Sequence, residues 1–177
     1  MTGAPTLTRP VSGQFIVLTL FGALMLNLLP WQGSALLLRP DFALLLLVYW
    51  TVHQPLRIGL TAAWILGLVM DVADGVLLGQ HALAYCATIY FSLALHRRIR
   101  AFGLWPQALH VFFLLLSSQA LLLLIHLISG AVFIGWGYFF ASVTGALLWP
   151  LLSLFLQQAQ KHPSRSEITY PPVRSDK

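Results

Sequence analysis

Long apolar runs, separated by short polar segments, constrain this 177-residue chain more than any other feature of its sequence. Apolar residues make up 58% of the chain, charged residues make up only 8%, and the mean hydropathy is +0.81. Soluble domains carry about three times that share of charged residues. A helix needs about 20 mainly apolar residues to cross the hydrocarbon core of a bilayer. The sequence therefore predicts an all-α fold, a polytopic membrane bundle of about six transmembrane helices.

The predicted spans cover residues 13–37, 42–52, 58–72, 82–95, 106–128 and 134–156. The first span is interrupted near Asn27 and Pro30. The second, third and fourth are shorter than a helix that crosses the membrane squarely, so either their flanks extend them or the bilayer thins around them. A five-span arrangement, in which the second and third segments merge or re-enter the membrane, is the alternative.

The basic residues predict the direction of the spans. Six crossings place nine of the ten Lys and Arg residues on one side of the membrane and leave only Arg39 on the other. Because an excess of Lys and Arg marks the cytoplasmic side, both chain termini are expected in the cytoplasm. The nine residues are Arg9, Arg57, Arg97, Arg98, Arg100, Lys161, Arg165, Arg174 and Lys177.

Three segments follow from this arrangement. Residues 1–11 form a cytoplasmic N-terminal segment, residues 12–158 the six-helix transmembrane domain, and residues 159–177 a disordered cytoplasmic tail rich in Pro, Ser and charge. The first apolar run lacks a small-residue cleavage site, so we interpret it as a retained span and not a signal peptide. The formal charge of +5 is spread through loops, which favours contact with membrane lipid and not with nucleic acid.

Asp71 and Asp74 need an explanation because they close an apolar run. A carboxylate at such a position costs several kcal/mol unless it contacts protein, water or a cation. Three residues apart on a helix, the two share one face, with Cβ atoms about 5–6 Å apart. Gly67 and Gly75 would let another helix approach. We interpret the pair as a polar site for a partner, substrate or cation. The alternative is a plain helix end, where Gly75 terminates the helix and water reaches the carboxylates.

The tripeptide Arg39-Pro40-Asp41 is a start signal for a helix. Pro is tolerated in the first turn, and an Asp beside it can accept from free backbone N–H groups. Arg39 is expected on the same side of the membrane as Asp71 and Asp74, so a salt bridge among these groups would offset their cost. The alternative is a helix start with a cap and no further role.

The remaining polar residues predict no catalytic or metal site. The six histidines are scattered and include no pair at ligand spacing, so we expect no metal and no cofactor. No nucleophile stands near a base, so we do not expect an enzyme. The cluster Arg97, Arg98 and Arg100 most simply anchors a cytoplasmic loop to anionic lipid.

Two motifs, one following the other along the chain, resemble those of a known family. Arg39-Pro40-Asp41 leads into the run FALLLLVYW, and Gly59 and the block GLVMDVADGVLLGQHAL, residues 67–83, follow. In this order the motifs resemble the MreD family of bacterial rod shape-determining membrane proteins, whose members have a similar length and number of spans. The likeness covers about residues 12–158.

The resemblance implies a non-enzymatic inner-membrane scaffold of the elongasome, the machinery that builds peptidoglycan during cell elongation. Family members bind MreC, a single-span protein with a large periplasmic part, and associate through it with RodA, a penicillin-binding transpeptidase and the MreB cytoskeleton. It also implies a fold similar to the substrate-binding subunits of energy-coupling-factor transporters. By this analogy an outer cleft for MreC would be shaped by Arg39, Asp41, Asp71, Asp74, Gly75 and Gly79.

Two other functions stay open at this point. A substrate-binding subunit of an energy-coupling-factor vitamin transporter would have an outer pocket with aromatic residues, for which Trp64 and Tyr85 are available. A membrane enzyme acting on lipid-linked sugars is the other, and the lack of a cation-binding carboxylate pair on the cytoplasmic side argues against it.

Overall fold

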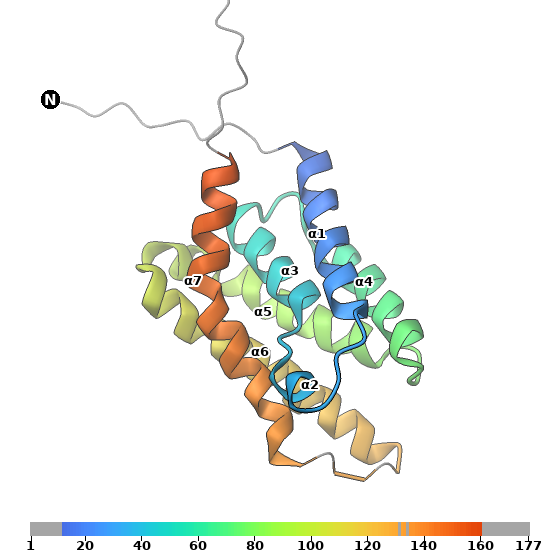
Figure 1. The fold of residues 1–177 in the computed structure, drawn as a ribbon. Coiled ribbons are helices and arrows are strands. Elements are labelled where there is room, and N and C mark those ends of the chain that lie inside the picture. Colours follow the sequence, from blue (N-terminus) through green and yellow to red (C-terminus); the bar gives the residue numbers. More distant parts are fainter. Residues whose placement is uncertain (1–11, 131, 134, 161–177) are drawn as a thin grey trace, which may run out of the picture.

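The computed structural model describes residues 12–130, 132–133 and 135–160, and all of their regular structure is helical. Within these residues there are six longer helices (Figure 1). The five-residue helix α2 lies between α1 and α3 in the chain, and the 3₁₀ helix η1 lies between α6 and α7. The prediction of an all-α bundle is confirmed. The elements are α1 (Gly13–Leu28), α2 (Ser34–Leu38), α3 (Phe42–His53), α4 (Leu60–Asp74), α5 (Gln80–Ala101), α6 (Leu104–Ile128), η1 (Trp136–Phe139) and α7 (Phe140–Gln160).

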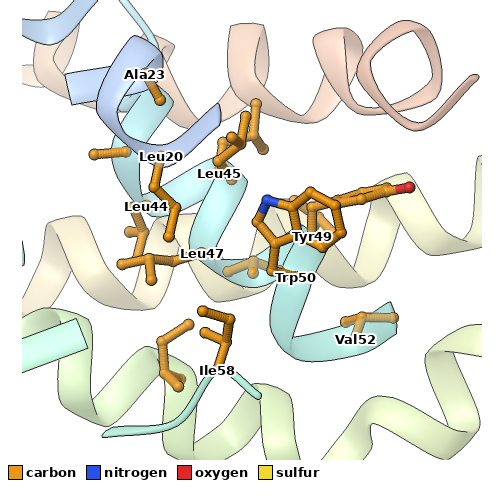
Figure 2. Close-up of a cluster of buried hydrophobic side chains, with 14 of the residues drawn as sticks. Leu20, Ala23, Leu44, Leu45, Leu47, Tyr49, Trp50, Val52 and Ile58 are labelled. Atoms are coloured by element: carbon orange, nitrogen blue, oxygen red, sulfur yellow. The ribbon is translucent and has the colours of Figure 1, made fainter. Parts of the chain in front are cut away.

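Helix α3 forms the centre of the bundle. All ten of its residues from Ala43 to Val52 are buried, and the helix packs against α1, α4, α5, α6 and α7. Figure 2 shows Leu44, Leu47 and Trp50 of this helix among side chains from its neighbours. A helix that is apolar on every side belongs inside a bundle and not at its edge. The continuous run FALLLLVYW therefore encodes the core.

The outer surface of the bundle is also apolar. Leu147, Leu151 and Phe155 are exposed along α7 at a spacing of four residues, which places them on one outward face. Within the described residues, three helical segments are long and apolar enough to cross a membrane, namely Leu36–His53, Leu104–Ile128 and Trp136–Gln160. A surface of this kind is suited to lipid and not to water. Helix α4 has 15 residues and is about 22 Å long at 1.5 Å per residue, less than the hydrocarbon thickness.

The first predicted span is broken into two helices. Helix α1 ends at Leu28, and Leu29 adopts an extended conformation before Pro30. A residue that precedes proline is pushed out of the helical region, which explains the break. Gly33, with φ of +62°, then starts the short helix α2. The interruption was predicted, but the separate helix α2 was not.

Two predicted boundaries are wrong. The fourth span, predicted to end at residue 95, is longer, because α5 continues to Ala101 and carries Arg97, Arg98 and Arg100 in its exposed last turns. Basic side chains are favourable there because they face the negative end of the helix dipole. Helix α7 likewise continues to Gln160 and takes in the first two residues of the predicted tail. The predicted segment 1–11 and the rest of the predicted tail, residues 161–177, lie outside the described residues.

Charged residues separate to the two ends of the bundle. Contacts toward one end join the first half of α1 to the end of α3, through Thr19 and Trp50 at 3.0 Å, and the end of α3 to the end of α7, through Tyr49 and Gln160 at 3.1 Å. Figure 1 shows the start of α1 and the end of α7 at its top. We call this the basic end, because it carries Arg57, Arg97, Arg98 and Arg100. The opposite end, which carries Arg39, Asp41, Asp71 and Asp74, is the acidic end.

Close packing of α4 on α5 depends on Gly67. A methyl group added there would lie 2.3 Å from the Ala82 Cα and 2.5 Å from the Ala82 nitrogen. Apart from the nearby backbone of α1 itself, none of the described residues has an atom within 4 Å of a methyl group added to Gly22. Gly67 is therefore required for the backbones to approach, whereas Gly22 is not.

We expect Gly67→Ala to lower the free energy of unfolding by about 1–3 kcal/mol, because α4 and α5 must move apart. Gly22→Ala is the matched control and should be neutral or stabilising by up to about 1 kcal/mol, since Ala favours a helix. Thermal unfolding in a mild detergent measures both. Equal destabilisation by the two variants would contradict the packing argument.

Candidate functional site at the acidic end

Asn27 joins the end of α1 to the start of α3. Its side-chain Nδ2 donates to Asp41 Oδ1 at 2.8 Å, and its Oδ1 accepts from the Phe42 N–H at 2.9 Å. Asp41 also caps α3, because its Oδ1 accepts from the Leu44 N–H at 3.0 Å. The predicted role of Asp41 as a helix start is confirmed. The polar residue in the apolar run LMLNLLP thus provides the partner that a buried helix start needs.

Tyr85 connects α5 to the same carboxylate. Its hydroxyl group donates to Asp41 Oδ2 at 2.5 Å, and its side chain is fully buried. Asp41 therefore accepts hydrogen bonds from α1, α3 and α5. Hydrogen bonds to an ionised carboxylate are stronger than neutral ones, so Asp41 holds three helices at one point.

Asp71 joins the end of α4 to the start of α5. Its carboxylate is fully buried, and it accepts from the N–H groups of Gly79 and His81, each at 2.7 Å. The Nδ1 atom of His81 lies 3.0 Å from Asp71 Oδ1. A free helix N-terminus offers unpaired N–H groups and a positive dipole, and Asp71 meets both. The carboxylate in an apolar bundle is thereby satisfied.

Gly75 and Gly79 shape the turn that brings Asp71 to α5. Gly75 has φ of +64° and ends α4 in a Schellman motif, in which the Val76 N–H donates to the Asp71 carbonyl and the Gly75 N–H to the Val72 carbonyl. Gly79 has φ of +103°, a conformation that residues with a side chain rarely adopt. Both glycines therefore act through the backbone.

Asp74 is less enclosed than Asp71. Its side chain is 37% exposed, and its Oδ2 lies 3.6 Å from His81 Nε2. One imidazole thus contacts both predicted aspartates. Arg39 was expected to form a salt bridge with Asp71 or Asp74. It forms neither within the described residues, so that prediction is wrong. Its Nη1 instead donates to the Asn27 carbonyl at 2.8 Å, because the chain reversal after α1 brings that carbonyl next to it.

A cavity of about 310 Å³ opens beside this network. Its polar wall includes Arg39, Asp41, Asp74 and His81, and its other wall comes from α6 and the segment that leads into α7. Gln119 of α6 donates to the Tyr138 carbonyl at 3.0 Å and accepts from the Ser142 hydroxyl, which ties that wall together. The cavity is also lined by Asn27, Leu36, Leu37, Leu44, Met70, Leu115, Ser118, Leu122, Ala141 and Ser142.

The predicted site residues have different positions. Arg39, Asp41 and Asp74 line the cavity, whereas Asp71, Gly75 and Gly79 build the turn beside it. The cluster Arg97, Arg98 and Arg100 lies at the opposite end of the bundle. Sequence reasoning missed Asn27 and His81 as members of the network. Asn27 could have been found as a lone amide in an apolar run, but nothing in the sequence pairs His81 with Asp71.

We expect Asp71→Asn to lower the free energy of unfolding by about 1–3 kcal/mol or more, because its amide would point a donor at N–H groups that need an acceptor. Asp74→Asn is the control three residues away. It should cost at most about 1 kcal/mol, since exposed ion pairs contribute little. Thermal unfolding of the two purified variants is the measurement. A larger effect from Asp74→Asn would contradict the assignment of Asp71 as the structural carboxylate.

Comparison with known proteins gives two agreeing results. A family model described as rod shape-determining protein MreD matches residues 10–159. The rod shape-determining protein MreD of Haemophilus influenzae is 28% identical over 155 residues, which cover 87% of this chain and 96% of that protein. No solved structure matches, so the comparisons give no support to the transporter-subunit alternative. The match extends over nearly all of the helical bundle, and the chain belongs to the MreD family of rod shape-determining proteins.

Proposed function

We propose that this chain functions in rod shape determination as a non-enzymatic scaffold of the inner membrane that binds MreC. Family membership supports the role in shape determination, and the name of the Haemophilus influenzae relative agrees with it. The apolar helical segments support a place in the membrane. Through MreC the chain would associate with RodA, a penicillin-binding transpeptidase and MreB.

The separation of charge supports six crossings with both termini in the cytoplasm. Arg57, Arg97, Arg98 and Arg100 share the basic end, and Arg39 alone among the described Lys and Arg residues lies at the acidic end. Because Lys and Arg concentrate on the cytoplasmic side, the basic end would face the cytoplasm and its arginines would contact anionic lipid. The acidic end would then face the periplasm, where the large part of MreC lies.

The acidic end carries the features expected of a docking surface, and this observation carries the proposal. Leu78, in the turn between α4 and α5, is 70% exposed, and α2 exposes Leu36 and Leu37 beside the cavity. The hydrogen bond from the Gly79 N–H to Asp71 fixes the turn that carries Leu78, and the Thr144 hydroxyl donates to the Leu38 carbonyl at the end of α2. Exposed apolar groups on a rigid frame bind a partner with little loss of conformational freedom.

The chemistry of the same region supports a scaffold and not an enzyme. The serines that line the cavity are Ser118, whose hydroxyl has no hydrogen-bond partner among the described residues, and Ser142, whose hydroxyl donates to Gln119. The histidine of the site, His81, is engaged with Asp71 and Asp74. A nucleophile activated by a base is therefore missing from the lining of this cavity.

The proposed direction predicts which loop a reagent reaches from outside the cell. In a Cys86→Ala background, Leu78→Cys should react with a membrane-impermeant maleimide in cells with a permeabilised outer membrane. Leu56→Cys, at a fully exposed position between α3 and α4, should react only after the inner membrane is broken. The reverse pattern of labelling would overturn the orientation.

The proposed docking surface predicts that Leu78→Asp weakens retention of MreC about tenfold or more, because a carboxylate without a partner is costly in an apolar contact and a tenfold loss corresponds to about 1.4 kcal/mol. Retention is measured by co-purification from native membranes in mild detergent. Leu56→Asp is the matched control at the basic end and should leave MreC bound.

Asp71→Leu is a second variant, because it removes the acceptor that ties α4 to α5. It should weaken MreC retention as well, and thermal unfolding shows how much of the loss follows from misfolding. Retention of MreC by both Leu78→Asp and Asp71→Leu would contradict docking at the acidic end. Failure of the unsubstituted chain to retain MreC would contradict the proposed function itself.

A further inference from the structure

Polar groups limit the part of α4 that suits hydrocarbon. At its start, the N-cap residue Gly59 has no side chain to accept from the first N–H groups of the helix, and Arg57 is exposed just before it. Such N–H groups have no partner within a helix and are not stable in hydrocarbon. At its end stands Asp74, whose side chain is 37% exposed. The apolar part of α4 is therefore no longer than the helix itself, about 22 Å.

Helix α5 has the same limits as α4. His81 and His96 enclose its mainly apolar residues 82–95, which extend over about 21 Å, and the exposed Arg97 follows. The Nε2 atom of His81 lies 3.6 Å from the Asp74 carboxylate. The polar limits of α4 and α5 at the acidic end are thus at one level.

Helix α6 is longer, but polar residues stand inside both of its ends. His110 and His126 are partly exposed and enclose the mainly apolar residues 111–125, which extend over about 22 Å. The length of the apolar stretch, and not the length of the helix, decides how much hydrocarbon the helix matches.

The two remaining outer helices agree with these values. Helix α1 is about 24 Å long, and α7 extends over about 25 Å from Phe140 to the residue before Gln157. A tilted helix crosses less thickness than its length, so all five lengths are upper limits. The hydrocarbon core of a typical bilayer is about 30 Å thick. Each apolar stretch is therefore shorter than that core by about 5 Å or more.

We call the exposed surface between these limits the apolar belt. It is formed by α1, α4, α5, α6 and α7, because α3 is enclosed by its neighbours. Among its exposed side chains are Phe21, Ile65, Leu83, Phe113 and Leu147.

We propose that the apolar belt fits a thin bilayer, so that the chain prefers phospholipids with short acyl chains and thins a bilayer of longer ones. In a bilayer of typical thickness, Asp74, His110 and His126 would lie in hydrocarbon, where polar side chains are costly. Lys and Arg can extend a charged head to the interface, but Asp and His have side chains too short to do so. Thinner lipid around the belt removes that cost.

This inference rests on the six crossings proposed above and does not depend on the binding of MreC. The labelling of Leu78→Cys and Leu56→Cys tests the crossings separately, so a failure of the topology can be told from a failure of the lipid preference.

Competition between lipids tests the preference. The purified full chain is reconstituted with dibrominated dioleoylphosphatidylcholine, which quenches tryptophan fluorescence, mixed with dimyristoleoyl-, dioleoyl- or dierucoylphosphatidylcholine, whose chains lengthen in this order. Trp64 is exposed on α4 and reports which lipid contacts the belt. We expect the dimyristoleoyl lipid to displace the brominated lipid about twofold better than the dioleoyl lipid does, because mismatch costs a fraction of a kcal/mol per Å. A dimyristoleoyl lipid that competes no better than the dioleoyl lipid would overturn the proposal.

Spin labels on the exposed face of α4 measure the thinning directly. In a Cys86→Ala background, nitroxides are attached one at a time at Thr61, Ile65 and Val72. Their depth follows from relaxation by oxygen, which concentrates in hydrocarbon, relative to a water-soluble nickel complex. We expect Thr61 and Val72 to lie near the headgroups in both dioleoyl and dierucoyl vesicles, with Ile65 deeper. Labels at Thr61 and Val72 that sink deeper in the dierucoyl vesicles would show that the bilayer is not thinned. A label that neither reagent reaches would show a face covered by protein and would also overturn the proposal.

Variants of α6 test the assigned limits. His110→Leu combined with His126→Leu lengthens its apolar stretch at both ends, so the preference for the dimyristoleoyl over the dioleoyl lipid should decrease. Ser117→Leu is the matched control, because Ser117 is exposed in the middle of the same helix and its replacement lengthens nothing. Trp105, exposed at the start of α6, reports the lipid beside this helix. Equal preferences in the double variant and the control would contradict the limits set by the two histidines.

Discussion

The need to pair buried carboxylates, amides and free helix ends decides how this bundle is put together. In an apolar bundle there is little water to satisfy a carboxylate, an amide or a free helix end. Asp71 answers this constraint by accepting from the first N–H groups of α5, and Asp41 answers it by accepting from α1, α3 and α5 at once. Both carboxylates lie where helices begin, which is where unpaired donors are concentrated. The two aspartates, whose burial in apolar runs would otherwise be costly, are the residues that connect the helices.

Much of the fold could be predicted because its signals are local. The run FALLLLVYW, the break before Pro30 and the cap at Asp41 each act within a few residues, and the structure agrees with them. The errors come from longer range. The arginines after residue 96 resemble a loop by composition, but the dipole of α5 accommodates them in its last turns. Likewise, nothing near Arg39 in sequence reveals that the Asn27 carbonyl lies beside it.

The site could be predicted in part for the same reason. Asp71 and Asp74 stand out by type and position, and Gly75 and Gly79 by their turn chemistry. The two aspartates have different roles because their burial differs: Asp71 is fully buried, and the side chain of Asp74 is 37% exposed. The cavity depends on the distance between α6 and the start of α3, and no sequence pattern reports that distance. A network that fixes helices and a cavity that leaves Ser118 unpaired therefore lie side by side at one end.

The burial of α3 has a consequence for synthesis. This helix has only 12 residues, follows α1 closely in the chain, and is apolar on all sides. Its burial is completed by α7, the last described helix, which covers Tyr49 with Trp149 and Gln160. A nascent chain that has made only its first helices therefore holds its core segment in lipid or against the insertion machinery. The bundle therefore closes only after α7 has been made, and α1 and α3 are synthesised before the contacts that complete their burial exist.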